Sequence, residues 1–308
     1  MTFWVNSLSA GIVLGTPLAY AALGELIAER AGVMNLGVEG MMLMGAVVGF
    51  IVSVTTHSAV AGFAAAAGAG AALASVHALM TIGLRVNQIV MGLTLTILGG
   101  GLSAYIGTGY SGLRPGVHIT AIPIPGLSSL PVLGKVLFDH DVFAYAAPVL
   151  AVAIWLVLHR SRVGLWLRAA GEQPGAADAS GVPVFLIRYV AVMVGGGLAG
   201  LAGAYFSVVY TQGWAEGMTN GRGWIAIALV IFGSWDPIVV LLGALLFGFV
   251  DGLNFQFQGI GVPVSTHLLA MMPYVFTLVV LVATWTRMRH RHVGMPEALG
   301  LPYEREAR

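Results

Sequence analysis

The stretch from Gly40 to Leu84 reads GMMLMGAVVGFIVSVTTHSAVAGFAAAAGAGAALASVHALMTIGL and contains no Asp, Glu, Lys or Arg. A helix needs about 20 mostly apolar residues to cross a bilayer, so this run is long enough for two crossings. Three further runs lack these charges, at 86–113, 189–215 and 252–286. Four such runs in one chain predict a bundle of membrane-spanning helices.

The composition agrees with this prediction. Hydrophobic residues make up 58% of the chain and charged residues 9%, whereas about a quarter of the residues in a soluble domain are charged. So few charges cannot cover a water-facing surface of this size. The chain has no Cys, which excludes disulfides, thiolate metal sites and a Cys nucleophile. We therefore expect an all-α integral membrane protein that forms a single transmembrane domain over residues 1–308.

We expect about nine transmembrane helices, within a range of eight to ten. The predicted segments are 8–27, 33–54, 60–83, 87–107, 142–159, 184–209, 223–235, 238–256 and 266–286. The seventh is short for a full crossing, so we expect it to be broken or tilted.

The basic residues divide unequally between the two sides of this bundle. One side holds eleven of them: Arg30, Arg85, Arg160, Arg162, Arg168, Arg188, Arg287, Arg289, Arg291, Arg305 and Arg308. The other side holds three: Arg114, Lys135 and Arg222. Because basic residues stay cytoplasmic, the N-terminus is expected outside and the C-terminus inside. Residues 108–140 then form an external loop, 160–183 a cytoplasmic loop, and 287–308 a cytoplasmic tail.

The motifs of soluble and membrane enzymes are missing from the chain. A phosphate-binding loop of the G-x-x-x-x-G-K-[ST] type is excluded because the single Lys, Lys135, is followed by Val136. The sequence also lacks H-E-x-x-H and G-x-S-x-G, and its eight His are scattered. We therefore expect no catalytic residues, no metal ligands and no cofactor bound by this chain.

The loop between the fifth and sixth segments contains a short helix signal. Pro174 suits the first turn of a helix, and Gly181 suits the left-handed residue that ends one. Between them lie mostly Ala residues, with Asp178 near the middle. Such a small-faced helix either docks into a groove of another protein or is a plain interfacial connector.

The connection between the first two segments places charges directly against apolar runs. Glu25, Glu29 and Arg30 are expected at the cytoplasmic boundary, where Glu–Arg pairing costs little. Asn35 and Glu39 are spaced i, i+4, so we expect them on one face at the start of the second helix. A carboxylate there is costly unless it is paired or hydrated.

Two motifs carry a resemblance to a known family. Residues 168–182, R-A-A-G-E-Q-P-x-A-A-x-x-x-G-V, resemble the coupling-helix segment of bacterial ABC importer permeases of the branched-chain amino acid, ribose and nucleoside type. In that family this segment seats in the ATPase subunit. The resemblance implies coupling roles for Gly171, Glu172, Gln173, Pro174, Ala177, Asp178 and Gly181. Gln173 departs mildly from the pattern, which more usually has Asn.

The second motif indicates one branch of this family. Residues 24–42, G-E-x-x-x-E-R-x-G-x-x-N-L-G-x-E-G-M-M, resemble the smaller of two paralogous permease subunits of nucleoside importers. This implies a multi-pass protein of the bacterial cytoplasmic membrane whose partners are an ABC ATPase subunit, a larger permease and an extracytoplasmic solute-binding protein. ATP and Mg²⁺ would be held by the ATPase partner, and no nucleic acid is expected to bind.

Polar residues in or beside the apolar segments are candidates for lining a translocation path. They are Asn35, Glu39, Asn87, Gln88, Trp224, Asp251, Asn254, Gln256 and His267. Phe255, Phe257 and Trp224 are able to stack on a base. For each candidate the alternative role is a helix-to-helix hydrogen bond or an interfacial anchor. Nucleosides are the first expected substrate, then ribose-type sugars and branched-chain amino acids. A stand-alone secondary transporter is the alternative of another class.

Overall fold

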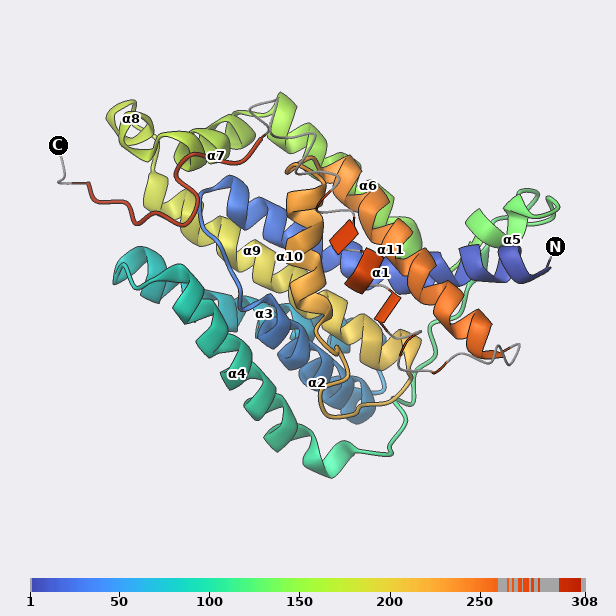
Figure 1. Ribbon diagram of the computed structural model, residues 1–308. Helices are drawn as coiled ribbons and strands as arrows, with labels where there is room; N and C mark the ends of the chain where they lie inside the picture. Colours follow the sequence, from blue (N-terminus) through green and yellow to red (C-terminus); the bar gives the residue numbers. More distant parts are fainter. Residues whose placement is uncertain are drawn as a thin grey trace.

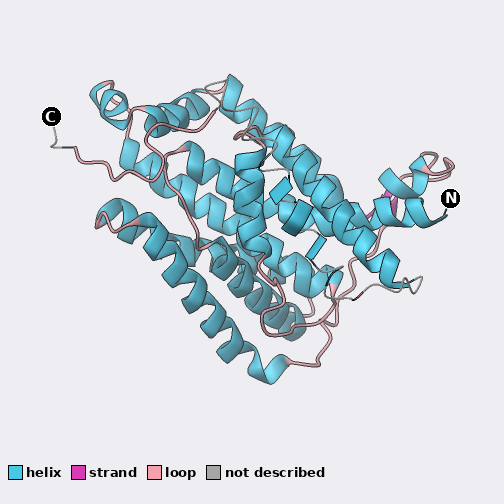
Figure 2. Ribbon diagram, viewed as in Figure 1, coloured by secondary structure: helices cyan, strands magenta, loops and turns pink. Residues whose placement is uncertain are grey.

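The computed structural model describes residues 2–259 and 294–305, together with residues 265, 268, 271, 272, 274–276, 278, 279 and 282. The described chain is mostly helical (Figure 2). Its strands, β1 (Ile122–Pro123) and β2 (Asp139–His140), form one short antiparallel pair in the 108–140 loop. Among the described residues, seven helices are long and apolar enough to cross a membrane, in agreement with an all-α membrane protein.

The helices follow one another along the chain with few long connections. They are α1 (Thr2–Arg30), α2 (Val38–Thr56), α3 (Ala59–Ala78), α4 (Gln88–Gly107), α5 (Leu133–Leu137), α6 (Val142–Arg160), α7 (Arg162–Glu172), α8 (Pro174–Ala179), α9 (Val184–Ala204), α10 (Arg222–Phe232) and α11 (Pro237–Gly259). Two of them continue into π-helical turns, α3 into η1 (Leu79–Gly83) and α9 into η3 (Tyr205–Tyr210), and α4 continues into the 3-10 turn η2 (Thr108–Tyr110).

Eight of the predicted segments correspond to helices in the structure. The second was predicted to begin at residue 33, but α2 begins at Val38. Gly32 has a φ of +86°, which ends α1 and lets residues 31–37 run as a non-helical connection. The ninth predicted segment, 266–286, lies largely outside the described residues.

The centre of the bundle is α1, which packs against α9, α10 and α11, while α2 packs against α3, α4 and α9. Backbones touch where α2 crosses α9. A Cβ at Gly45 would meet the backbone of Gly200, and one at Gly203 would meet the carbonyl oxygen of Met42. These glycines therefore let the helices approach closely.

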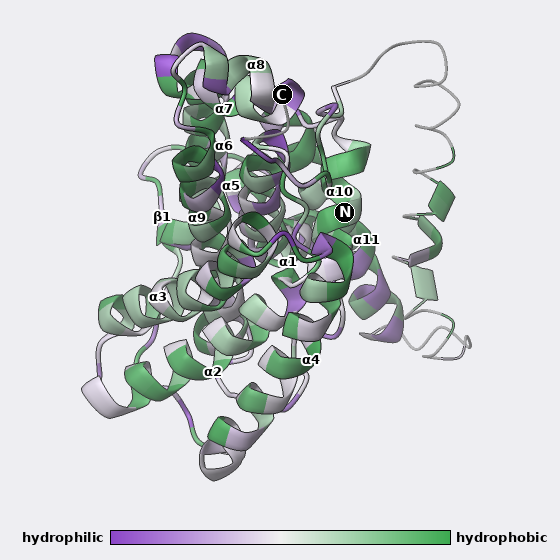
Figure 3. Ribbon diagram, turned by 90° about the vertical axis from the view of Figure 1, so that its left-hand side faces the viewer, coloured by the Kyte–Doolittle hydropathy of each residue, from purple (hydrophilic) through white to green (hydrophobic). Residues whose placement is uncertain are grey.

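The two ends of the bundle differ in composition (Figures 1 and 3). The start of α1 lies beside the 108–140 loop, where Lys135 Nζ donates to Asn6 Oδ1 at 3.0 Å. At the opposite end, α7 and α8 lie beside the C-terminal residues, and hydrophilic residues gather there. Seven of the eleven basic residues assigned to one side are described, and all of them lie at this end: Arg30, Arg85, Arg160, Arg162, Arg168, Arg188 and Arg305. Which end faces the cytoplasm remains a prediction.

At the end of α1, Glu25, Glu29 and Arg30 have other partners than the expected Glu–Arg pairs. Arg30 donates to the carbonyl oxygens of Trp235 and Gly294. Glu29 accepts from Trp235 Nε1, and Glu25 accepts from the backbone N–H of Asn35 at 2.8 Å. These buried carboxylates therefore hold the connections that follow α1 and α10.

Candidate functional site

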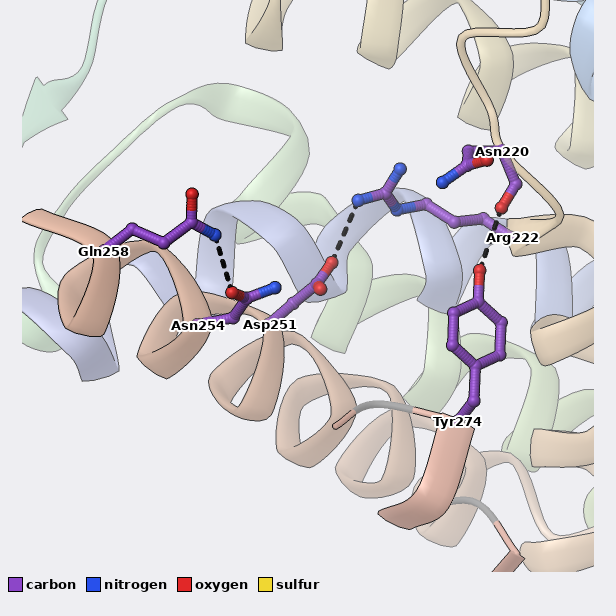
Figure 4. Close-up of polar contacts among 6 residues, drawn as sticks. All are labelled: Asn220, Arg222, Asp251, Asn254, Gln258 and Tyr274. Carbon is purple, nitrogen blue, oxygen red and sulfur yellow. Dashed lines mark hydrogen bonds and ion pairs between the residues drawn. The ribbon is translucent and has the colours of Figure 1, made fainter. Parts of the chain in front are cut away.

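A polar pocket of about 220 Å³ lies between α10, α11 and Tyr274 (Figure 4). Its lining combines hydrogen-bonding side chains with aromatic rings. The lining residues are Asn220, Arg222, Ile225, Phe247, Asp251, Asn254, Phe255, Gln258 and Tyr274. Ligand pockets typically have this character, with apolar walls and a few polar groups that fix orientation.

Helical spacing explains why α11 presents four of these side chains together. Asp251, Asn254, Phe255 and Gln258 are spaced i, i+3, i+4 and i+7, so they share one face. Gln258 Nε2 donates to Asn254 Oδ1 at 2.7 Å, which fixes both amides along the pocket wall (Figure 4). Gln256, at i+5, lies on another face of α11 and does not line the pocket.

An ion pair crosses the pocket from α10 to α11. Arg222 Nη2 lies 2.9 Å from Asp251 Oδ2, and the two side chains are 16% and 11% exposed. The Arg222 guanidinium also lies 5.0 Å from the centre of the Phe206 ring, a favourable cation–π arrangement. The pair therefore carries no net charge into the pocket.

The helix that supplies Arg222 is only half the length of a membrane crossing. Eleven residues of α10 rise about 16 Å, against about 30 Å for the hydrocarbon core. Its C-terminal end meets α1, where Trp235 contacts Glu29 and Arg30. The seventh predicted segment is therefore a broken helix that begins inside the bundle, as its short length suggested.

Glu39 binds the N-terminus of this broken helix. Its Oε1 accepts from Thr219 Oγ1 at 2.7 Å and from the N–H of Gly221 at 2.8 Å, while Oε2 accepts from the N–H of Gly223 at 2.6 Å. A Cβ at Gly223 would lie 2.5 Å from Glu39 Cα, so only glycine fits there. Glu39 is thereby satisfied without a basic partner, and it compensates the positive end of the α10 dipole.

Three other path candidates hold local structure in the described chain. Asn35 lies in the connection before α2, where Gly37 N–H donates to its Oδ1 at 3.1 Å, so it does not share a helix with Glu39. Gln88 accepts from the N–H of Met34 at 2.7 Å. Asn87 is exposed and caps the N-terminus of α4 by accepting from two backbone N–H groups.

The remaining candidates do not join the pocket. Neither Trp224 nor Gln256 is among the residues that line it. Phe257 packs against Phe3, with ring centres 5.7 Å apart, while Phe255 does line the pocket. His267 lies outside the described residues. Of the nine predicted path residues, the structure therefore brings Asp251 and Asn254 together.

Sequence reasoning missed Asn220, Arg222, Gln258 and Tyr274. Arg222 was counted as a loop charge, whereas it is the first residue of α10 and lies inside the bundle. Tyr274 donates from its hydroxyl to the carbonyl oxygen of Asn220 at 3.1 Å. The i, i+3, i+7 spacing in α11 was the available signal for Gln258.

A second candidate surface lies at the end of the bundle that carries α7 and α8. Pro174 is at the start of α8, and Gly181 follows it with a φ of +84°, so both helix-end signals are confirmed. A shallow, mostly apolar groove of about 430 Å³ runs between these helices. It is lined by Leu165, Trp166, Ala169, Glu172, Gln173, Ala176, Ala177, Ser180 and Val182.

The predicted coupling residues have different positions around this groove. Glu172, Gln173 and Ala177 line it, and Gly181 is exposed beyond it. Gly171 is buried. A Cβ at this position would meet the carbonyl oxygen of Arg30. Ala177 is buried in a small core beneath α8.

Comparisons with known proteins identify the family of the chain. Residues 7–290 match the family described as branched-chain amino acid transport system / permease component. No solved structure matches the chain.

Three curated relatives align with the chain over most of its length. A provisionally named glucose ABC transporter permease of Haloferax volcanii is 41% identical over 99% of both chains. A nucleoside ABC transporter permease of Lactococcus lactis subsp. cremoris is 33% identical over 88% of this chain and 89% of its own. A guanosine ABC transporter permease of Bacillus subtilis is 32% identical over 96% and 95%. With its apolar helices and this nearly complete match, the chain is a multi-pass protein of the cytoplasmic membrane and belongs to the branched-chain amino acid transport system permease family of ABC transporters.

Proposed function

We propose that this chain is the membrane-spanning subunit of an ATP-driven importer and that it carries an uncharged polar solute, with nucleosides as the first candidate. The observation that carries the choice of solute is the charge balance of the pocket between α10 and α11. Arg222 is neutralised by Asp251, and the N-terminal end of α10 is occupied by Glu39.

An uncharged solute suits such a pocket better than an amino acid. A branched-chain amino acid has a carboxylate and an ammonium group, and each needs a charged or strongly polar partner once it is desolvated. A nucleoside has hydroxyl and amide-like groups for Asn220, Asn254 and Gln258, and a ring face for Phe255. The likeness to nucleoside and guanosine permeases supports the same choice.

The groove between α7 and α8 supports coupling to an ATPase subunit. In helix-in-groove contacts the apolar face of a helix lies in a groove of the partner, and α8 with its neighbouring mostly apolar groove offers such a contact surface. The chain then supplies the path and the coupling segment. ATP and Mg²⁺ bind to the ATPase partner, whose hydrolysis supplies the energy that shifts the permease between outward- and inward-facing states.

Membership of this family supports further partner subunits in general. We propose that a second, larger permease completes the path and that an extracytoplasmic binding protein delivers the solute to the 108–140 side. The N-terminus is then outside, and α7, α8 and the C-terminus are cytoplasmic.

Glucose is a second candidate substrate, because the Haloferax relative is provisionally named for it and is 41% identical. Glucose is also uncharged and rich in hydroxyl groups, so the charge balance of the pocket fits it equally well. Uptake assays separate the two.

The test is a competition experiment in cells that carry the complete transporter. Labelled guanosine and labelled glucose are each offered with and without an excess of unlabelled guanosine, glucose or leucine, and a strain lacking this chain is the control. The proposal predicts uptake of one of the first two and no competition by leucine. Uptake inhibited by leucine would contradict the assignment of an uncharged solute.

A further inference from the structure

The C-terminal residues 294–305, here called the strap, return to the end of the bundle that carries α7 and α8 (Figure 1). The strap first meets the end of α1. Arg30 Nη1 donates to the carbonyl oxygen of Gly294 at 3.0 Å, and the N–H of Gly300 donates to the carbonyl oxygen of Gly32 at 3.3 Å. One part of the strap is therefore attached to the start of the 31–37 connection, which leads to Glu39.

The strap also binds the last residues of α7. The N–H of Ala298 donates to the carbonyl oxygen of Gly171 at 2.9 Å, and the N–H of Glu297 donates to Glu172 Oε2 at 3.2 Å. Gly171 and Glu172 are two of the predicted coupling residues. Their orientation thus depends partly on the strap.

Tyr303 anchors the strap in a small core under α8. The buried members of this core are Ala170, Ala177, Val182 and Val184, and Tyr303 packs against them. The Tyr303 ring lies 5.5 Å from the ring of Phe185 and 6.0 Å from the guanidinium carbon of the buried Arg188. Because α8 has six residues, three of them Ala, it contributes only Ala177 to this core, and Tyr303 adds a large side chain beside it.

The two residues after Tyr303 extend the contact to either side. Glu304 pairs with Arg85, after α3, at 2.8 Å, and Arg305 pairs with Asp178 of α8 at 3.1 Å. The exposed fractions are 43% and 50% for Arg85 and Glu304, and 69% for Arg305. Such exposed pairs contribute little to stability, so the half-buried Tyr303 and the backbone hydrogen bonds hold the strap in place.

We propose that the strap is a structural part of the coupling apparatus, with Tyr303 as its positioning residue. A displacement of α8 by the ATPase subunit passes through the strap to residues 31–37 and the start of α2. There Glu39 holds the N-terminus of α10 and thereby the position of Arg222. The inference rests on the proposed function, because it requires an ATPase that acts on α8.

Hydrogen exchange of backbone amides tests the inference in the intact complex, purified from its native membrane through an N-terminal tag. Exchange is measured with and without a non-hydrolysable ATP analogue. Four forms of the chain are compared: the full-length chain, a chain that ends after Val293, Tyr303→Ala, and Tyr303→Phe, which keeps the ring. ATP-dependent uptake of labelled guanosine and glucose is measured in parallel.

The full-length chain and Tyr303→Phe should show analogue-dependent exchange changes in both α8 and residues 31–37. In the truncated chain and Tyr303→Ala the change should stop at α8, and ATP-dependent uptake should fall several-fold with equal amounts of ATPase recovered. A change that still reaches residues 31–37 without the strap would overturn the inference, as would its absence from the full-length chain. Loss of the ATPase on truncation would make the strap a docking surface instead, and so would overturn it too. Failure of any ATPase to co-purify with the full-length chain would refute the proposed function itself.

Discussion

Asp251 and Arg222 pair inside the bundle, where an unpaired charge is costly. Removing one partner of a buried pair typically costs about 3–5 kcal/mol, mostly because the remaining charge is left uncompensated. Both side chains also face the pocket, so the pair has a structural role and a place in the proposed path. A double variant that exchanges the two charges restores the ion pair and so separates these two roles.

Asp251→Ala should therefore lower both the amount of folded protein and the uptake per molecule. The charge-reversed double variant, Arg222→Asp with Asp251→Arg, should recover folded protein, because a pair is again present, while uptake stays low because the pocket is rearranged. Quantitative blotting of membranes and uptake assays give the two values. Unchanged uptake in Asp251→Ala would remove this residue from the path.

Gln256→Ala serves as the matched control on the same helix. Gln256 is a half-buried polar residue of α11 that does not line the pocket, and Phe257 beside it packs on Phe3. Its substitution should leave uptake close to that of the unchanged chain. A loss as large as that of Asp251→Ala would show that the pocket is not what the assay reports.

Residue-level prediction from sequence succeeded where a single helix sets the geometry. Asp251 and Asn254 share a face by spacing alone, and Pro174 and Gly181 mark helix ends by their backbone preferences. It failed where a partner comes from a distant segment. The donors to Glu39 lie about 180 residues away at Thr219, Gly221 and Gly223, and no local pattern in the sequence reveals them.

Among the elements, α10 depends most on a single side chain outside itself. The Glu39 carboxylate accepts from two backbone N–H groups and one hydroxyl at its N-terminus. A half-length helix cannot satisfy these donors by itself, because the first N–H groups of any helix lack partners within it. The position of Arg222, and so the shape of the pocket, follows from this contact.

Glu39→Gln should destabilise the protein and disturb the pocket. The amide has one acceptor oxygen, and its NH₂ group would face backbone donors, so at least one buried N–H is left unsatisfied at a cost of about 1–3 kcal/mol. The thermal midpoint of the detergent-solubilised protein should fall, and the uptake of solute should fall with it. A midpoint equal to that of the unchanged chain would contradict the assigned role of the carboxylate.

Two glycines of α9 give a sharper comparison of helix packing. A Cβ at Gly200 would overlap the carbonyl oxygen of Ala66 in α3, whereas the nearest atom to a Cβ at Gly197 is the Ala67 carbonyl oxygen at 3.6 Å. Gly200→Ala should cost about 1–3 kcal/mol through overpacking. Gly197→Ala should be neutral or slightly stabilising, because Ala is the better helix former. Thermal unfolding of both variants tests this, and equal effects would contradict the close α3–α9 contact.

Element boundaries were predictable from apolar length, with exceptions that have a physical cause. The prediction merged residues 33–37 with α2, because Met34, Leu36 and Val38 continue the apolar run. The positive φ of Gly32 and the contact between Asn35 and Glu25 bend the chain there instead. Such tertiary contacts cannot be inferred from hydropathy.

At the scale of the whole molecule, the two ends of the bundle are chemically distinct. The connection after α6, the α7–α8 pair and the strap meet at one end, while the 108–140 loop and the start of α1 meet at the other. Eleven basic residues are assigned to the side that carries α7 and α8 and three to the other, which predicts that the α7–α8 end is cytoplasmic.

Labelling of single cysteines tests this orientation, because the chain has no Cys of its own. Ser129→Cys in the 108–140 loop should react with a membrane-impermeant maleimide in intact cells. His159→Cys at the end of α6 should react only after lysis, since both residues are exposed at opposite ends of the bundle. The reverse pattern would invert the proposed topology.

In the proposed function, transport by this chain is driven by ATP through partner subunits. The most direct measurement is uptake of labelled guanosine and glucose by proteoliposomes that contain the co-purified complex or the chain alone. Only the complex should accumulate solute, ATP should be required, and a non-hydrolysable analogue should not replace it. Accumulation by the chain alone, without ATP and dependent on an ion gradient, would instead identify a secondary transporter.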